Sequence, residues 1–520
     1  MKTFCCNIFN RPTRILILFS LFRGFSSAQI DFSSIKSDVS VHNYSVIQYQ
    51  SKPIGYNIVF RIADKNLNKL AINFLDLNAD LSASLEIENA AGLHVIETAY
   101  NEEHFAVLFL NIPQRQLEVR LYSLKAIEVS RSIKQLTSLD LEYFTSKISQ
   151  NSASRGHNNF LFEIGKNGFM LMYNTVEKNL NTCNISKIHV DSSLERFYNF
   201  ITDRAIFQSK YLGMKNNKLF FSFETSALNH SGNTIEIIAL GVDQFDPIFE
   251  IEQKDNSKKI FIPTNIVKSN TNSNLILYGR FYNSIADINN PYHDGIGFWE
   301  ITQSGLRVKE NYIGFKLGFT DLKFNDNNKA SDLGFLFTHE AKRTTEGSIF
   351  LISEGYKKLA DEGGVSVGFG MMSPMMMTGD RYLKIRTTDI LISVFDSNFN
   401  YIRSYTHEKT SNTKTIGYYE YGNIYHLGAY FNQIGYLDFL YSEIDEKDEN
   451  INIYYKNYQT SRNSTIRINK LTISDQDPIV KTIEKRFNTF ETFFLPRSFG
   501  KMTIMEFISR KKTMYFEFKQ

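Results

Sequence analysis

Apolar and polar residues alternate along much of this chain, and the alternation recurs in pairs of segments joined by a short turn. The clearest pair is residues 390–408, in which Ile390, Ile392 and Val394 occupy every second position. The turn formers at residues 396–398 follow, and the alternation then resumes. A period of two is typical of β-strands, and turn residues between two such runs indicate a hairpin. Residues 390–408 are therefore predicted to form a β-hairpin.

Related hairpins are predicted along the whole chain. Six other stretches follow the same pattern: residues 70–88, 117–133, 185–200, 235–252, 297–313 and 466–484. Two further strand-like runs precede most of them, as residues 93–100 and 104–110 precede 117–133. Four antiparallel strands repeated at a period of about 50 to 65 residues are the sequence signature of a β-propeller. We therefore expect an all-β fold with four-stranded blades.

The two ends of the chain are expected to share one blade. Residues 491–496, 502–508 and 513–518 give three strands without an outgoing fourth. Residues 30–35 could supply that strand and close the ring. Seven hairpins and one shared blade favour eight blades, whereas seven blades follow if residues 117–133 are not a hairpin. A row of independent sandwiches is the alternative architecture, because repeated hairpins do not establish ring closure.

One stretch interrupts the repeat. A Gly- and Met-rich segment at about residues 355–388 exceeds the usual spacing and is interpreted as a loop inserted into the propeller domain, residues 29–520. Its beginning is predicted to form a short helix through Lys358 and Ala360. The glycines and Pro374 that follow disfavour regular structure.

Composition supports a packed core and argues against a nucleic-acid partner. The chain has 520 residues, 14% of them aromatic, and aromatic side chains favour strands. Basic and acidic residues nearly balance at 58 and 55, and no basic stripe is visible. No overall electrostatic field therefore favours nucleic acid or an anionic membrane.

The N-terminus is predicted to be an export signal. Lys2, Arg11 and Arg14 precede an apolar run at residues 15–22, and small residues end at Ala28. A short buried strand or an anchoring helix is the alternative, although this run is too short to span a bilayer. With residues 1–28 removed, Cys183 is the remaining cysteine and no internal disulfide can form. A secreted, periplasmic or cell-surface location without a transmembrane span follows.

Five methionines form the most unusual local cluster. They lie within the inserted loop: Met371, Met372, Met375, Met376 and Met377. Adaptable thioether side chains suit partner binding, and soft sulfur suits Cu(I) or Ag(I). Because no His or Cys accompanies them, a loop folded onto the propeller or a partner contact is the preferred interpretation over a metal site, and no cofactor is expected.

Ionisable clusters are few. His293-Asp294, near Trp299 and Glu300, and His339-Glu340, near Arg343, are candidates for acid–base chemistry. Neighbours on a strand point to opposite faces, so we interpret these residues as polar groups of loops or strand edges. The acidic residues 443–449 could bind calcium, but without the spacing of an EF-hand loop they indicate a solvated hairpin tip. Catalytic motifs such as HExxH and the P-loop are absent from the sequence.

Several features together resemble the uncharacterised exported propeller-like proteins of Bacteroidetes. They are the signal before Gln29, the turns at residues 191–194 and 396–399, the run at residues 349–358 and the terminal strand at 510–519. The resemblance implies an envelope or extracellular location and a binding scaffold, and it brings no catalytic residues.

These observations lead to two functional expectations and a third, structural one. The first is a non-enzymatic envelope protein that recognises a protein or glycan partner through loops on one propeller face. The alternative is a glycan hydrolase or lyase with carboxylates converging in the central channel. A structural component of a larger envelope complex is the third.

Overall fold

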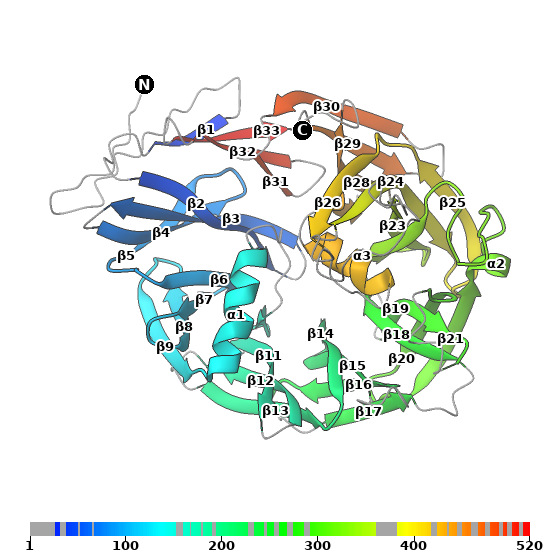
Figure 1. The fold of residues 1–520 in the computed structure, drawn as a ribbon, viewed down its shortest axis with the longest axis horizontal. Helices are drawn as coiled ribbons and strands as arrows, with labels where there is room; N and C mark the ends of the chain where they lie inside the picture. The colour runs from blue at the N-terminus through cyan, green and yellow to red at the C-terminus, as the bar shows by residue number, and fades with distance from the viewer. Residues whose placement is uncertain are drawn as a thin grey trace, which may run out of the picture. The chain divides into compact units, whose positions relative to one another are not determined.

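The computed structural model describes residues 27–519 with several gaps, and it is an all-β structure. Residues outside the described part are 1–26, 32–37, 50–51, 65–66, 152–159, 167, 178–179, 190–193, 227–232, 244–246, 254–258, 268–273, 285–291, 360–381, 418–423, 434–435, 445–449, 459–465, 474–478, 488–491, 497–501, 509–512 and 520. The described strands form antiparallel sheets of four strands, one of which carries a fifth (Figure 1). The predicted strand class and the four-stranded repeat are confirmed.

The chain divides into two compact units by its internal contacts. Unit 1 comprises Met1–Ser209, Gly241–Asp246 and Asn488–Gln520, and unit 2 comprises Lys210–Leu240 and Pro247–Phe487. Each unit contains four sheets, counting the sheet of β14 to β17 with unit 2, to which most of its residues belong.

Unit 1 begins and ends in one sheet. Its order is β1-β33-β32-β31, in which β1 (Ser27–Asp31) pairs with β33 (Thr513–Lys519). Ile30 lies opposite Met514 and is buried. The predicted pairing of the N-terminal strand with the C-terminal strands is therefore observed. The other two strands are β31 (Thr492–Pro496) and β32 (Met502–Ile508).

The other sheets of unit 1 follow the chain in order. The first contains β2 (Asp38–Tyr49), β3 (Lys52–Asp64), β4 (Leu67–Asp76) and β5 (Leu81–Ile87); the second contains β6 (Leu93–Tyr100), β7 (His104–Asn111), β8 (Gln116–Ser123) and β9 (Glu128–Gln135); the third contains β10 (Leu161–Glu163), β11 (Phe169–Glu177), β12 (Leu180–Ile188) and β13 (Leu194–Thr202). Strands β8 and β9 are paired, so residues 117–133 do form a hairpin.

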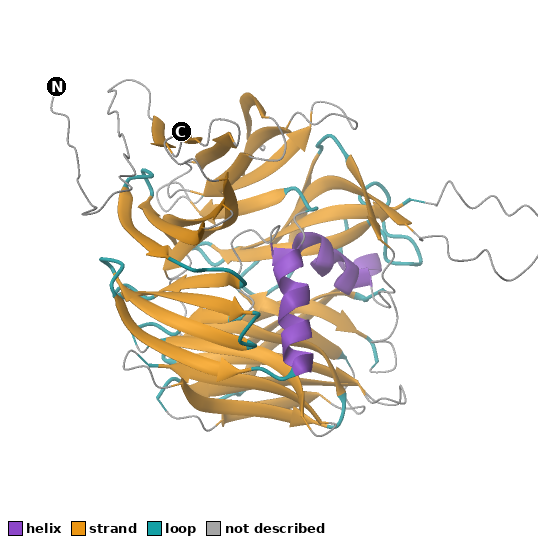
Figure 2. Ribbon diagram, turned by 60° about the vertical axis from the view of Figure 1, so that its left-hand side comes forward, coloured by secondary structure: helices purple, strands orange, loops and turns teal. Residues whose placement is uncertain are grey.

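Helix α1 (Ser138–Asn151) covers part of unit 1 and was not predicted. Thr137 caps it, since its Oγ1 accepts the Asp140 amide at 3.1 Å and Asp140 Oδ2 in turn accepts the Thr137 amide at 3.2 Å. Figure 2 draws the helices in purple. Phe144 of α1 packs on Phe160 and Tyr173.

Unit 2 contains the remaining four sheets. They are β14 (Ala205–Lys215), β15 (Lys218–Ser226), β16 (Asn233–Gly241) and β17 (Pro247–Gln253); β18 (Ile260–Ile266), β19 (Leu275–Tyr282), β20 (Gly295–Ile301) and β21 (Arg307–Gly314); β22 (Phe335–Arg343), β23 (Ile349–Lys358), β24 (Tyr382–Phe395) and β25 (Tyr401–His407); and β27 (Phe439–Ile444), β28 (Ile451–Tyr458), β29 (Ile466–Ile473) and β30 (Ile479–Phe487). The short helix α2 (Phe315–Gly318) follows β21.

A small platform extends the sheet of β22 to β25. The first half of β24 leaves β25 and pairs with β26 (Asn412–Gly417), while Tyr356 to Lys358 of β23 pair on its other side. Helix α3 (Ile424–Gln433) packs on this extension through Leu427 and Phe431. Lys358 therefore ends a strand, and the predicted helix through it is wrong. Ala360 and the rest of residues 360–381 lie outside the described residues.

None of the helices in the described part of the chain combines the length and the apolar character that crossing a membrane requires.

Candidate functional site

The main convergence of charged side chains in unit 2 is a buried cluster between two sheets. Glu354 of β23 lies beside Lys409, which follows β25, and Asp438, which precedes β27. All three side chains are 0% exposed. We call Glu354, Lys409, Asp438 and the adjoining His339, Thr387 and Tyr458 the ion cluster.

Lys409 is the cation that bridges Glu354 and Asp438. Its Nζ lies 2.6 Å from Asp438 Oδ2 and 3.2 Å from Glu354 Oε1. A buried carboxylate is costly unless it is paired and hydrogen-bonded, and one ammonium here serves two carboxylates.

Both carboxylates also accept hydrogen bonds. Asp438 accepts the hydroxyl protons of Tyr458 at 2.8 Å and Thr387 at 3.0 Å. Glu354 accepts the backbone amides of Asp438, at 2.9 and 3.0 Å, and Phe439, at 3.0 Å. Through these amides, the Glu354 side chain of β23 binds the backbone at the start of β27, the first strand of the next sheet.

The protonation states follow from these contacts. Burial alone would raise the pKa of Asp438, but Lys409 and neighbouring lysines outweigh it and bring the pKa to about 2. Burial would also raise the pKa of Glu354, which Lys409 and His339 nevertheless hold below its usual range. Burial opposes the charge of Lys409, yet Asp438 and Glu354 raise its pKa. Glu354, Asp438 and Lys409 are therefore all charged at neutral pH.

A β-bulge brings His339 into the ion cluster. The pairing of β22 with β23 passes from Thr338 to Glu340 and leaves His339 as the extra residue. Its Nε2 lies 3.3 Å from Glu354 Oε2, and its ring stacks on Phe439 with centroids 4.4 Å apart. Glu340 accepts a hydrogen bond from the Ser442 hydroxyl at 2.7 Å. His339 does lie on an edge strand, as expected, but its side chain is buried between two sheets.

The other sequence candidates do not join this cluster in the described structure. His293 is buried beside Gly295, and burial together with Arg280 lowers its pKa to about 4. The Asp294 carboxylate accepts the Asn283 amide, and Glu300 accepts Asn274 Nδ2. Glu443 accepts the Tyr454 hydroxyl, whereas residues 445–449 lie outside the described residues. Met371, Met372, Met375, Met376 and Met377 also lie outside them, so their role stays a prediction.

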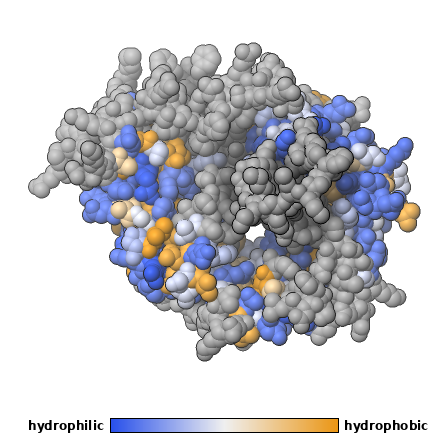
Figure 3. All heavy atoms as spheres, viewed as in Figure 1, coloured by the Kyte–Doolittle hydropathy of each residue, from blue (hydrophilic) through white to orange (hydrophobic). Residues whose placement is uncertain are grey.

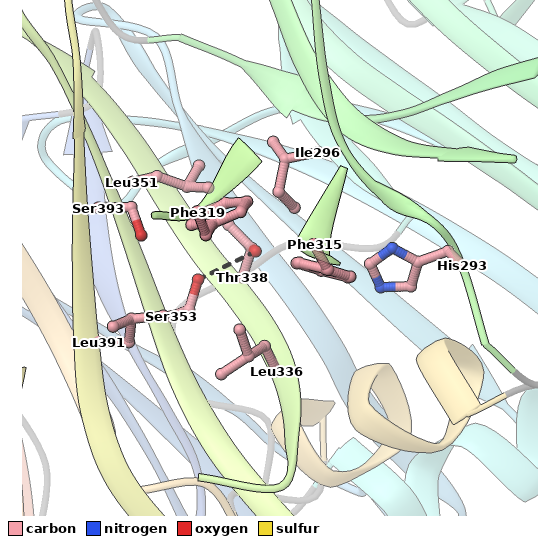
Figure 4. A pocket seen from close by; sticks show the side chains of 10 residues that line it. All are labelled: His293, Ile296, Phe315, Phe319, Leu336, Thr338, Leu351, Ser353, Leu391 and Ser393. Atoms are coloured by element: carbon pink, nitrogen blue, oxygen red, sulfur yellow. Dashed lines mark hydrogen bonds between the residues drawn. The ribbon is translucent and has the colours of Figure 1, made fainter. Parts of the chain in front are cut away.

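One cavity of unit 2 is small. It has a volume of about 10 Å³ and is lined by aliphatic and aromatic side chains together with His293, Thr338, Ser353 and Ser393 (Figure 4). The Thr338 and Ser353 hydroxyls are 3.1 Å apart. A space of this size holds about one water molecule. Within the described ranges, no group of three His, Cys, Asp or Glu side chains is placed to hold a metal ion.

Sequence reasoning missed the ion cluster, although it contained one usable signal. Glu354 and Asp438 are each a lone carboxylate within an apolar run. Such a residue requires a buried partner, which could have marked both positions. Lys409 follows Glu408 in a polar segment and carries no comparable signal.

Comparisons with solved structures find distant similarities. Prolyl oligopeptidase B from Galerina marginata is 8% identical, with 91% of this chain and 56% of that chain covered and a TM-score of 0.38. The chain thus spans little more than half the length of that peptidase. A polysaccharide lyase of family PL25, an ulvan lyase, is 10% identical over 81% of this chain and 90% of that chain, with a TM-score of 0.38. The apocarotenoid oxygenase of Synechocystis is 8% identical over 76% and 79%, with a TM-score of 0.35.

The search of curated proteins found no match. The family comparison matches residues 10–520, nearly the whole chain. This chain therefore belongs to DUF6770, a family of unknown function.

Proposed function

We propose that this protein is an exported, non-enzymatic binding scaffold, built as a β-propeller of eight four-stranded blades. Its ring would be closed by the sheet that both chain ends share. The export signal predicted at residues 1–28 supports a location in the envelope or outside the cell.

The chemistry of the ion cluster favours a structural role over catalysis. General acid–base residues need access to a substrate and a pKa near the working pH. Glu354 and Asp438 are instead fully buried and ionised; both bind Lys409, and Glu354 also accepts backbone amides. The carboxylates that come together in unit 2 therefore give no support to the glycan hydrolase or lyase alternative.

The binding proposal rests on β9, where apolar side chains are exposed and small polar side chains are buried. This strand is outermost in its sheet and is paired with β8. Its inward positions are the buried Ser130 and Ser132, whereas Val129 and Ile133 are 44% and 50% exposed. Ile127, in the preceding turn, is 63% exposed.

An unpaired strand edge with exposed aliphatic side chains is suited to one kind of partner. An extended segment of another protein can add to the edge through main-chain hydrogen bonds, and its side chains can pack on alternate positions. Glu128 and Arg131, paired at 2.9 Å, add polar groups to the same edge. We therefore assign the β9 edge as the binding surface and an extended protein segment as its occupant. On the face drawn in Figure 3, hydrophobic residues of the described chain lie in small separate groups among hydrophilic ones.

The test compares two matched double variants of the full chain. Val129→Ser/Ile133→Ser removes the exposed aliphatic groups of β9, and Leu306→Ser/Val308→Ser removes those at β21, where Leu306 and Val308 are 65% and 50% exposed. Each protein is expressed in its host, located by fractionation, and used to capture partners that are quantified by mass spectrometry. We expect the β9 variant to lose its specific partner by about tenfold or more. The β21 variant should retain it.

Equal capture by both variants would overturn the assignment. Light scattering of each purified protein tests whether a second copy of this chain occupies the edge. A wild-type dimer that becomes a monomer in the β9 variant would show that a second copy occupies the edge, and it would contradict the partner proposal. Unchanged thermal unfolding of both variants is the control, because exposed substitutions usually alter stability by less than about 0.5 kcal/mol.

A further inference from the structure

Three basic side chains meet at a seam within unit 1. His42 lies on β2, Arg61 on β3 and His94 on β6, so they join the sheet of β2 to β5 with the sheet of β6 to β9. The rings of His42 and His94 are 5.6 Å apart, centroid to centroid, and tilted by 45°. We call these three residues the basic seam.

The backbone places the basic seam directly at the contact between the sheets. His42 is the extra residue of a β-bulge, because the pairing of β2 with β3 passes from Val41 to Asn43. Asn43 Nδ2 then donates to the Ile96 carbonyl at 3.2 Å. Arg61 Nη2 donates to the Leu93 carbonyl at 2.7 Å, next to His94. The two histidines therefore lie beside the hydrogen bonds that tie one sheet to the other.

The charges around the seam give a protonated imidazole little compensation. Arg61 is a permanent cation beside both rings. On the neighbouring strands, Lys69 of β4 is paired with Glu86 and Glu88 at 3.6 and 2.8 Å. Glu97 of β6 is bound to the amides of Phe160 and Leu161, at 2.9 Å each. Among the described residues, Glu86, Glu88 and Glu97 are thus already bound to other groups.

Protonation would also leave a buried donor without an acceptor. His94 Nδ1 is buried and has no hydrogen-bond partner among the described residues. Burial, Arg61 and His94 lower the pKa of His42 to about 4, and burial and Arg61 lower the pKa of His94. Both rings are therefore uncharged in the folded chain at neutral pH.

We propose that the basic seam is an acid-sensitive latch, at which protonation of His42 and His94 loosens the contact between the sheet of β2 to β5 and the sheet of β6 to β9. Three like charges then repel one another at the hydrogen bonds of Asn43 and Arg61. This device is independent of the partner surface proposed above.

The sign of the pH dependence follows from linkage. A histidine whose pKa is lowered by folding binds its proton more readily when the seam is open. The closed seam is therefore fully favoured above about pH 6.5 and loses stability progressively as the pH falls toward 4.

Hydrogen exchange of the full chain at pH 7 and pH 5 tests the latch. After correction for intrinsic exchange rates, we expect the Asn43 and Ile96 amides to be about twentyfold less protected at pH 5 than at pH 7. Protonation of His42 alone accounts for this factor. Amides of β28 in unit 2 serve as the internal reference. In the His42→Gln/His94→Gln variant, the ratio of protection at the two pH values should be close to one.

Two outcomes would overturn the latch. One is an equal loss of protection in β2, β6 and β28, which would indicate general acid unfolding. The other is an unchanged pH dependence in the double variant. If the double variant does not fold, the single variant His42→Gln provides the same comparison. It should remove about half or more of the pH dependence of protection.

Discussion

At the scale of residues, one turn recurs in both units. The turn has five residues. The amide of the first residue donates to the carbonyl of the fifth, and the amide of the fourth donates to the carbonyl of the first. The turn occurs at residues 76–80, 123–127, 302–306, 325–329, 344–348 and 396–400. The fourth residue has a left-handed backbone, with φ of 60° at Ala79 and 67° at Phe399. Left-handed backbone at this position closes a hairpin with a one-residue bulge.

Side chains explain why the sequence identified these turns. Asp396 Oδ1 accepts the amides of Asn398 and Asn400, at 2.8 Å each, and Asp76 Oδ1 does the same for Asn78 and Asp80. The interpretation of Asp396 as a turn residue is thus confirmed by its own contacts. Residues 191–193 of the similar turn at 191–194 lie outside the described residues. Turns depend on local chemistry, and local chemistry is visible in a sequence.

Replacing Asp396 tests the turn. We expect Asp396→Ala to lower the free energy of unfolding by about 1 kcal/mol, because two backbone amides lose their acceptor. Asp396→Asn keeps an acceptor oxygen and should lose less than half as much. Although its slight burial acts to raise the pKa of Asp396, the hydrogen bonds from Asn400 and Asn398 lower it. The difference between wild type and Asp396→Asn should thus shrink as acid titrates this carboxyl, in chemical denaturation at several pH values. Equal stability of Asp396→Ala and wild type would contradict this role.

At the scale of elements, polar residues tie the first strands of neighbouring sheets together. The first strand of several sheets has a one-residue bulge, and the residue after it reaches the next sheet. Asn43 bonds to Ile96, Glu97 bonds to Phe160 and Leu161, and Glu340 bonds to Ser442. The bulges themselves interrupt the registers of β2, β6 and β22. These ties position the sheets with a specificity that hydrophobic packing alone does not give.

Sequence patterns located the strands but not these ties. Glu354 and Asp438 are 84 residues apart, and Lys409 is 29 residues from Asp438. Such pairs depend on which sheets become neighbours and where a bulge turns a side chain. The alternation of apolar and polar residues predicts neither the neighbouring sheets nor the bulges.

Removing the cation of the ion cluster should be strongly destabilising. We expect Lys409→Met to lower the free energy of unfolding by about 3–5 kcal/mol, because two buried carboxylates lose their counter-charge. Lys409→Met/Asp438→Asn should recover part of that loss, since one uncompensated charge is removed. Urea unfolding at pH 7 measures both variants.

The matched control for this prediction is an exposed lysine. Lys316 pairs with Asp326 at the surface, and Lys316→Met should change stability by less than about 1 kcal/mol. A Lys409→Met protein as stable as wild type, or a double variant less stable than Lys409→Met, would contradict a structural role for the ion cluster.

At the scale of the whole molecule, the repeat in the sequence and the sheets of the structure agree closely. All seven predicted hairpins are paired strands, and β1 pairs with β33. Repetition made this readable, because each sheet repeats the same order of strands. The helices α1 and α3 depart from the repeat, and no periodic pattern along the chain predicted them.

We propose that these sheets form one propeller that serves as a scaffold. Single-particle cryo-electron microscopy of the full chain tests it most directly. We expect one closed ring of eight blades, with the sheet of β1 and β31 to β33 seated between its two neighbours. Two separate bodies, an open row of sheets or a ring with another number of blades would contradict the claim.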